Sequence, residues 1–238
     1  METSALRTLW IECFGNAEGW IDSFLATAFD PNHVCTLNRQ GRLAAALCWM
    51  DVSCQGRKLA YLYAIATAPD FRRQGLCREL MGLTHEKLSE QGYAGTILVP
   101  ADAGLRRMYG EIDYVNFGGI REITAQAGSP CSMRRLSPEE YAAARRGYLP
   151  PGGVVQEHGA IEYLAAGAKL YGGADVLVAM SGDSGLELLG NTDAAPGILT
   201  ALGLEGGTFR TPGDRPFAMY HSLTGERWTP GYFGLAFE

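Results

Sequence analysis

Apolar residues near the N-terminus recur at the spacing of an α-helix. Residues at positions i, i+3, i+4 and i+7 lie on one face of a helix, and that face can be buried. Two sets of apolar residues have this spacing: Leu6, Leu9, Trp10 and Cys13, and then Ile21, Phe24, Leu25 and Ala28. The pattern therefore predicts two amphipathic helices, with a break between them at Gly15-Asn16 and with Pro31 just beyond the second.

After the second helix the pattern becomes that of β-strands. Residues 33–38 and 43–52 are strand-like and are joined by a turn that contains Gly41. The next segment, which starts at Tyr61, has apolar residues on both faces, as is typical of a strand buried on both sides. Pro69 ends this strand, because proline cannot donate a ladder hydrogen bond. The three segments predict a three-stranded meander.

Helices and strands alternate in the rest of the first half. The predicted elements are a helix over 75–91, a strand over 96–99, a helix over 105–112 and a strand over 115–123. Gly92 follows the first of these helices, as glycine often does just past a helix end. Asp102 is placed to cap the N-terminus of the second.

A second set of elements follows a change of composition at 125–130, which indicates a domain linker. Ser137-Pro138-Glu139-Glu140 has the pattern of a capping box with proline at the first helical position, so a helix is expected to start there and to end at Gly147. The later predicted elements are a helix over 161–168 closed by Gly172-Gly173, strands over 176–180 and 186–189, a helix near 196–202, and strands near 208–210, 217–223 and 232–237.

Length, charge and hydropathy restrict the class of protein. The chain has 238 residues, of which 47% are hydrophobic, so it can hold one large domain or two smaller ones. The net charge of −6 argues against a nucleic-acid binder and suits a cationic amine as substrate. The N-terminus does not show the basic region followed by an apolar run that is typical of a signal peptide. The longest apolar run, 43–50, is too short to span a bilayer. We expect a cytoplasmic protein without membrane or nucleic-acid partners.

Neither the cysteines nor the histidines predict a metal site. The six cysteines show no C-x-x-C spacing and are expected to be reduced thiols. His85 lies on the polar face of its predicted helix, and His33, His158 and His221 are isolated in the sequence. Gly182-Asp183-Ser184-Gly185 resembles the nucleophile loop of trypsin-like proteases, but a hairpin turn between two strands explains this segment better.

The segment from Tyr61 to Cys77 carries the most chemical information. A buried strand is followed by a tight turn with arginines and a glycine, and then by a helix. The first N–H groups of a helix have no partner within it and its dipole favours negative charge, so this turn is a candidate anion site. The segment resembles the acetyl-CoA-binding core of the GNAT N-acetyltransferases, whose motif is Arg/Gln-x-x-Gly-x-Gly/Ala. Arg72 and Gly75 match it, and Cys77 stands where the family usually has glycine or alanine.

The resemblance implies an α/β (α+β) GNAT fold, in which helices flank a mixed central sheet. The order of elements after residue 130 looks like a second GNAT-like half, but the coenzyme A motif does not recur in it. We therefore expect a GNAT catalytic domain that binds acetyl-CoA over 1–125, and a degenerate GNAT-like domain over 131–238. This layout is similar to the tandem-GNAT proteins of the Eis type, without their sterol-carrier-like domain. The family usually opens with a short edge strand, and the sequence leaves open whether this strand is missing or the true start of the chain lies upstream.

The resemblance also implies how acetyl-CoA is held. Backbone N–H groups of the turn hold the pyrophosphate, with added charge from nearby arginines. The strand before the turn separates from its neighbour and pairs with the pantetheine arm. The residues predicted to bind acetyl-CoA are Ile65, Ala66, Thr67, Arg72, Arg73, Gln74, Gly75, Leu76, Cys77 and Arg78. The alternative interpretation is a surface turn with solvated arginines.

Tyr109 is the predicted general acid. In the family, a tyrosine in a Tyr-x-x-x-Gly-Phe pattern protonates the departing thiolate; here Tyr114 supplies the aromatic residue and Asp113 replaces the glycine. A phenol with a pKa of about 10 is protonated at neutral pH and can give its proton to a thiolate. The alternative is a tyrosine that only packs in the core.

The sequence does not select a general base or an acceptor. Candidate carboxylates are those of Glu12, Glu18, Asp22 and Asp51, and a further hypothesis assigns the role to the terminal carboxylate of Glu238. The predicted function is transfer of an acetyl group from acetyl-CoA to a small amine or lysine acceptor in a ternary complex, without a metal. The rival prediction is a non-catalytic acyl-CoA sensor. The acyl-chain preference and the oligomeric state, a homo-oligomer included, stay open.

Overall fold

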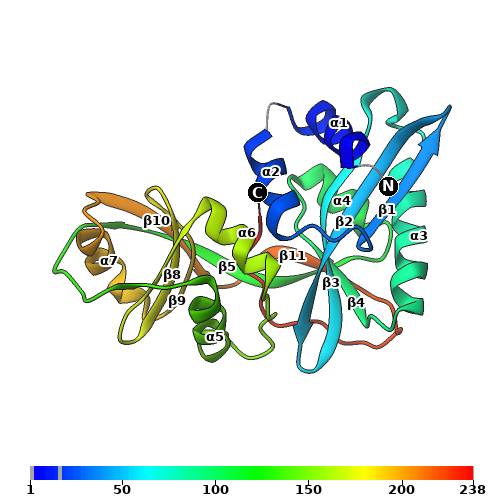
Figure 1. The fold of residues 1–238 in the computed structure, drawn as a ribbon. Helices are drawn as coiled ribbons and strands as arrows, with labels where there is room; N and C mark the ends of the chain where they lie inside the picture. Colours follow the sequence, from blue (N-terminus) through cyan, green and yellow to red (C-terminus); the bar gives the residue numbers. More distant parts are fainter. Residues whose placement is uncertain (1–2, 16–17, 238) are drawn as a thin grey trace.

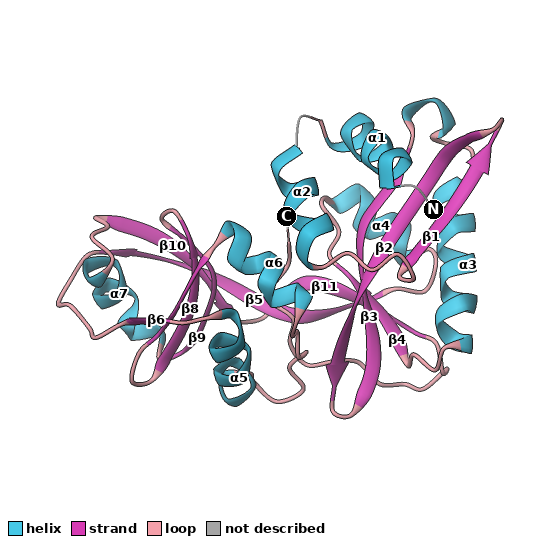
Figure 2. Ribbon diagram, in the orientation of Figure 1, coloured by secondary structure: helices cyan, strands magenta, loops and turns pink. Residues whose placement is uncertain are grey.

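The computed structural model describes residues 3–15 and 18–237 and arranges them in two lobes joined by one mixed β-sheet (Figure 1). Within these residues the sheet has 11 strands, in the order β1-β2-β3-β4-β11-β5-β10-β9-β8-β7-β6. Helices lie against both halves of this sheet (Figure 2). The mixed sheet flanked by helices confirms the predicted fold class.

The N-terminal half of the chain builds the first lobe. Its elements are α1 (Thr3–Phe14), α2 (Glu18–Thr27), β1 (Val34–Arg39), β2 (Arg42–Cys54), β3 (Arg57–Thr67), a short 3-10 helix (Pro69–Phe71), α3 (Leu76–Glu90), β4 (Gly95–Leu98), α4 (Ala103–Gly110) and β5 (Val115–Gln126). They confirm the two N-terminal helices, the meander and the alternating elements predicted from the sequence. Residue 16, part of the predicted helix break, lies outside the described residues.

The C-terminal half of the chain follows the predicted order of elements with two additions, and its last strand, β11, lies in the sheet of the first lobe. Its elements are β6 (Arg134–Arg135), α5 (Pro138–Tyr148), α6 (Gly159–Gly167), β7 (Lys169–Gly172), β8 (Val176–Ser181), β9 (Ser184–Gly190), a 3-10 helix (Thr192–Ala194), α7 (Ala195–Ala201), β10 (Gly206–Pro212) and β11 (Arg215–Ser222). Strands β6 and β7 were not predicted, and β7 occupies residues expected to close the preceding helix. The turn at residues 182–183 connects β8 to β9, as predicted.

One predicted strand is wrong. Residues 232–237 form no strand, and only Tyr232 makes an isolated bridge, to Gly153. The segment is apolar because it is buried against the first lobe: Phe233 is fully buried and its ring lies 4.9 Å from that of Tyr61. Burial, and not strand pairing, therefore explains its composition.

Strand β5 joins the two lobes. Residues 115–120 of β5 pair with β11, and residues 120–126 pair with β10, both antiparallel. On its other side β11 pairs with β4 of the first lobe, while β10 pairs with β9 of the second. A strand from the end of the chain therefore completes the sheet of the N-terminal lobe. The predicted domains 1–125 and 131–238 share this sheet, and β5 continues into the segment that was predicted to be a linker.

The lobes also meet through helices. Helix α2 of the first lobe packs against α6 of the second (Figure 1). Gly159 allows their close approach, because a Cβ atom there would lie only 2.5 Å from the carbonyl oxygen of Thr27. No helix in residues 3–15 or 18–237 is long and apolar enough to cross a bilayer.

Candidate active site

The parallel strands β3 and β4 separate part-way along their length. They are paired from Leu59 to Tyr61 of β3, and the rest of β3, residues 62–67, has no partner on the β4 side. A bulge in β3 coincides with this separation: Ala64 has a φ of 51°, and the register with β2 shifts there. The carbonyl oxygens of Ala64 and Thr67 accept hydrogen bonds from Trp10 and Arg72. The other backbone groups on this side of β3 face the gap, where a ligand can pair with them. This geometry agrees with the separation expected from the sequence.

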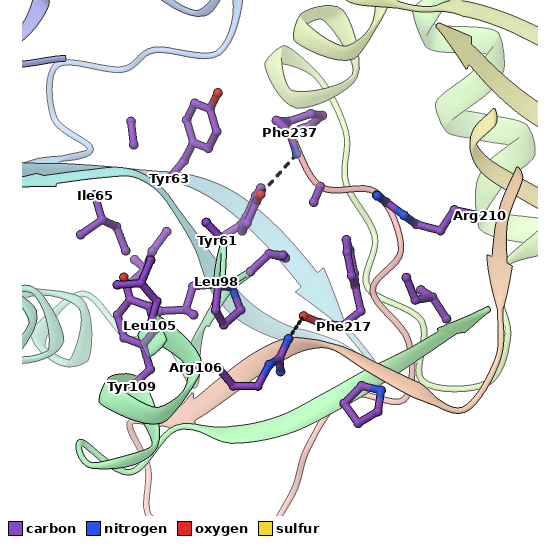
Figure 3. Close-up of a pocket in the computed structure, with 18 of the residues that line it drawn as sticks. Tyr61, Tyr63, Ile65, Leu98, Leu105, Arg106, Tyr109, Arg210, Phe217 and Phe237 are labelled. Carbon is purple, nitrogen blue, oxygen red and sulfur yellow. Dashed lines mark hydrogen bonds between the residues drawn. The ribbon is translucent and has the colours of Figure 1, made fainter. Parts of the chain in front are cut away.

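A cavity of about 780 Å³ lies at this gap, between the two lobes. Its wall includes residues of β3, β4 and α4 from the first lobe, and Arg210, Phe217 and Phe237 from the end of the chain (Figure 3). Several lining residues are aromatic: Phe14, Trp20, Tyr61, Tyr63, Tyr109, Phe217 and Phe237. A volume of this size is sufficient for a small-molecule acceptor.

Tyr109 lies on this wall, on the same side of the cavity as Ile65 and Leu105 (Figure 3). Helix α4, which carries it, is capped by Asp102, whose carboxylate accepts a 2.7 Å hydrogen bond from the Leu105 N–H. Only 4% of Tyr109 is exposed, and burial raises its pKa above the ordinary value for tyrosine. Its hydroxyl has no hydrogen-bond partner among the described residues. The Tyr109 hydroxyl is therefore protonated, and no hydrogen bond to the described residues occupies it, near the gap between β3 and β4.

The turn between β3 and α3 has the backbone form of an anion site. Gly75, the N-cap of α3, has a φ of 82°, in the left-handed region that favours glycine, and the space beside its Cα atom is open. No side chain caps this end of the helix. The first N–H groups of α3 are therefore available to an anion, with the dipole of a 15-residue helix behind them.

Three arginines surround this turn in different ways. The Arg72 Nε–H donates to the carbonyl oxygen of Thr67 at 3.1 Å, which ties the turn to the end of β3. Arg78 forms a 3.2 Å ion pair with Glu111. Arg73 is exposed and has no ion-pair partner in the described part of the chain. Of the predicted coenzyme-binding residues only Ile65 lines the large cavity; the others follow it along the end of β3 and the turn.

The comparison with known proteins agrees with this geometry. Residues 1–115 match the family model of the acetyltransferase (GNAT) domain. Residues 1–115 therefore form a GNAT domain. No match is found among proteins whose functions have been curated.

Solved GNAT structures resemble the whole chain in fold. A GCN5-related N-acetyltransferase from Kribbella flavida is 18% identical, with a TM-score of 0.65 over 93% of this chain and 69% of that one. Eis1 from Mycobacterium abscessus is 15% identical, with a TM-score of 0.65 over 93% and 70%. A tandem GNAT protein from the clavulanic acid biosynthesis pathway is 11% identical, with a TM-score of 0.56 over 93% and 95%. At these identities the likeness shows a tandem GNAT fold.

Of the candidate bases, Glu12, Asp22 and Asp51 do not line the cavity in the part of the chain that the structure describes. Glu12 pairs with Arg42 at 2.8 Å, Asp22 pairs with Arg7, and Asp51 accepts a hydrogen bond from Tyr93. Glu18 begins α2, and Glu238 lies outside the described residues. The carboxylate that does line the cavity in the described part of the chain is that of Glu122, on β5, which the sequence did not single out. Its oxygen lies 3.0 Å from a guanidinium nitrogen of Arg215.

Two histidines that looked isolated in the sequence are in contact. The rings of His85, on α3, and His221, on β11, stack with centroids 4.2 Å apart and planes 9° apart. The His85 Nε2 atom lies 2.9 Å from the Tyr114 hydroxyl, which is also 2.6 Å from Thr96 Oγ1. The sequence did not predict this contact of His221 with His85, which arises because β11 enters the sheet beside β4. Among the residues described, no group of three or more His, Cys, Asp or Glu side chains could hold a metal ion.

Proposed function

We propose that this GNAT protein transfers an acetyl group from acetyl-CoA to the nitrogen of a primary amine, with Tyr109 as the general acid. The observation that carries this proposal is the position of Tyr109. Tyr109 lines a cavity at the gap between β3 and β4, and its hydroxyl has no hydrogen-bond partner among the described residues. The resemblance to the GNAT family implies that the coenzyme binds in this part of the fold.

The residues of the turn suit the phosphates of acetyl-CoA. Open N–H groups at the start of α3 would donate hydrogen bonds to the pyrophosphate, and Arg73 would add a positive charge that no carboxylate of the described chain neutralises. Cys77 is half-buried in the first turn of α3 and leaves the opening beside Gly75 unobstructed. Ala66 and Thr67 pair with β2 on one side, and the side of residues 65–67 that β4 leaves open would hold the pantetheine arm by strand-like hydrogen bonds.

The transfer needs one bond formed, one bond broken and one proton returned. The neutral amine attacks the thioester carbonyl carbon, and a backbone N–H of β3 in the gap stabilises the charge that develops on the carbonyl oxygen. The carbon–sulfur bond then breaks, and the Tyr109 hydroxyl donates its proton to the sulfur. The amide nitrogen loses its surplus proton to solvent, from which Tyr109 is reprotonated. Burial raises the pKa of Tyr109, which keeps it protonated until the carbon–sulfur bond breaks. Burial of the leaving thiolate raises the pKa of the thiol as well, which favours transfer of the proton to sulfur.

The test is the rate of free-thiol release from acetyl-CoA with a panel of amines, for the wild type and for Tyr109→Phe. Loss of the hydroxyl should lower the rate by roughly ten- to a thousand-fold while the affinity for acetyl-CoA is kept. Tyr171→Phe, on β7 of the second lobe, is the matched control and should keep the wild-type rate. Wild-type activity in Tyr109→Phe would show that Tyr109 only packs in the core.

A second candidate function is an acyl-CoA sensor without catalysis. Two departures from the family pattern favour it: Cys77 in the phosphate turn and Asp113, which adopts a φ of 66° where the family usually has glycine. Tight binding of acetyl-CoA with no thiol release on any amine would support the sensor. Retention of an unpartnered tyrosine hydroxyl at the gap favours the enzyme, because binding alone does not need an acid.

A further inference from the structure

The described wall of the large cavity contains arginines and a carboxylate. Its described lining includes Arg106, Arg210 and Arg215, and its carboxylate is that of Glu122. Arg215 and Glu122 form an ion pair, so their charges largely cancel. A cationic acceptor would therefore find no unpaired carboxylate in the described part of the wall.

Arg106 is placed to act on a molecule bound beside Tyr109. The two residues are three apart on α4, which puts them on one face of the helix, about 4.5 Å apart along its axis. Figure 3 shows the Arg106 side chain in the cavity between Tyr109 and Phe217. It is half-buried, so its interactions are only partly weakened by water.

The hydrogen bonds of Arg106 end on uncharged oxygen atoms. Its guanidinium donates to the side-chain oxygen of Asn116 and, at 2.9 Å, to the carbonyl oxygen of Phe217. No carboxylate pairs with it among the residues that the structure describes, and burial lowers its pKa. A guanidinium has five N–H donors, and these two bonds leave others for a ligand. The two neutral acceptors thus fix the orientation of the Arg106 guanidinium, and no carboxylate of the described residues neutralises its charge.

The rest of the wall suits an apolar side group. Trp20, Tyr61 and Tyr63 lie on the first-lobe side, and Phe217 and Phe237 come from the end of the chain. Aromatic walls of this kind bind aromatic or aliphatic groups by burial of apolar surface.

We propose that the acceptor amine carries a carboxylate, which Arg106 binds, and an apolar side group, as an α-amino acid does. This inference rests on the proposed acetyl transfer and names its substrate class. An amine and a carboxylate one carbon apart can reach the reacting centre near Tyr109 and the guanidinium one helical turn away. The planar guanidinium suits a carboxylate because it can donate two parallel N–H bonds.

The experiment compares acceptors that differ only in the carboxylate: phenylalanine with phenethylamine, and tryptophan with tryptamine. In the wild type, kcat/KM should be at least about 10-fold higher for the amino acid of each pair. Arg106→Gln should lower kcat/KM for the amino acids by about 10- to 100-fold, the value of a charge-assisted hydrogen-bond pair, and should change the plain amines by less than about threefold. Arg106→Lys should restore part of the preference for the amino acid over the plain amine. Arg107 is the exposed neighbour on α4, and Arg107→Gln should keep the full wild-type preference.

Arg106 also holds β11 through Phe217, so a purely structural role must be distinguishable. Equal loss of activity on both members of each pair would assign Arg106 to structure alone and overturn the proposal. A wild-type preference for the plain amines would overturn it as well.

Binding of N-acetylphenylalanine, measured by calorimetry against N-acetylphenethylamine, gives a readout that does not require turnover. Preference for the carboxylate compound, lost in Arg106→Gln, would support the carboxylate site even if no amine were acetylated and the proposed function failed. Absence of that preference would contradict the carboxylate site whatever the activity.

Discussion

The stacked pair His85–His221 makes the stability of this protein depend on pH. His85 is held between the Tyr114 hydroxyl and the His221 ring, and Asp113 is the charged group that faces His221. Burial, and secondly the neighbouring His221, lower the pKa of His85 from 6.5 to about 4. Burial lowers the pKa of His221 as well, against the opposing effect of Asp113. Both rings are therefore neutral in the folded protein at neutral pH.

The sign and size of the effect follow from these values. Because the unfolded chain binds the proton more tightly, the contribution of His85 is fully present above pH 6.5, is lost as the pH falls towards 4, and is constant below that. The gap between 6.5 and about 4 corresponds to roughly 3 kcal/mol. Since part of the ring contacts solvent, we expect about 2–3 kcal/mol.

The perturbation is His85→Gln, which can still hydrogen-bond to Tyr114 but cannot take up a proton. The assay is the free energy of unfolding in urea, measured by circular dichroism between pH 7.5 and 4. Over this range the wild type should lose about 2–3 kcal/mol more than His85→Gln. His158→Asn, at an exposed position, should follow the wild type. Identical losses in the wild type and His85→Gln would refute the assignment of this pH dependence to His85.

Two further predictions concern a buried ion pair and the phosphate turn. Glu187→Gln removes the negative charge that lies 2.6 Å from the buried Arg145 guanidinium and should cost about 3–5 kcal/mol of unfolding free energy. Glu226→Gln removes a surface ion pair and should cost less than about 1 kcal/mol, so equal losses in a urea titration would contradict this reasoning. Gly75→Val forces a β-branched residue to a φ of 82°, so it should weaken acetyl-CoA binding in calorimetry and lower the unfolding free energy by roughly 1–2 kcal/mol. The control, Gly82→Ala in the middle of the same helix, should raise the unfolding free energy by up to about 1 kcal/mol. Unchanged coenzyme affinity in Gly75→Val would place the phosphates elsewhere.

Local patterns predicted the elements of this fold well because they depend on near neighbours. The spacing of Leu6, Leu9 and Trp10 predicted α1, and all three are buried. The capping box at Ser137 forms as expected, with the Glu140 N–H 3.2 Å from the serine oxygen. The positions of Tyr109 and of the turn before α3 also followed from the sequence, through their resemblance to the GNAT motifs.

Contacts between distant segments could not be predicted in this way. The apolar pattern of β11 marks a buried strand, but its partners in β4 and β5 lie about a hundred residues earlier, and periodicity does not specify partners. For the same reason the sequence did not bring His221 to His85, or Phe217 to Arg106. The residues 232–237 were taken for a strand because burial in a loop and burial in a sheet give the same apolar composition.

The most direct test of the central claim is a two-substrate kinetic measurement, in which the initial rate of thiol release is followed while acetyl-CoA and the amine are varied together. Direct transfer in a ternary complex predicts no release without the amine, intersecting double-reciprocal lines, and one acetylated amine formed for each thiol. Parallel lines would contradict direct attack, because they indicate a covalent acyl-enzyme. Tight acetyl-CoA binding with no release on any amine would contradict the proposed enzyme itself.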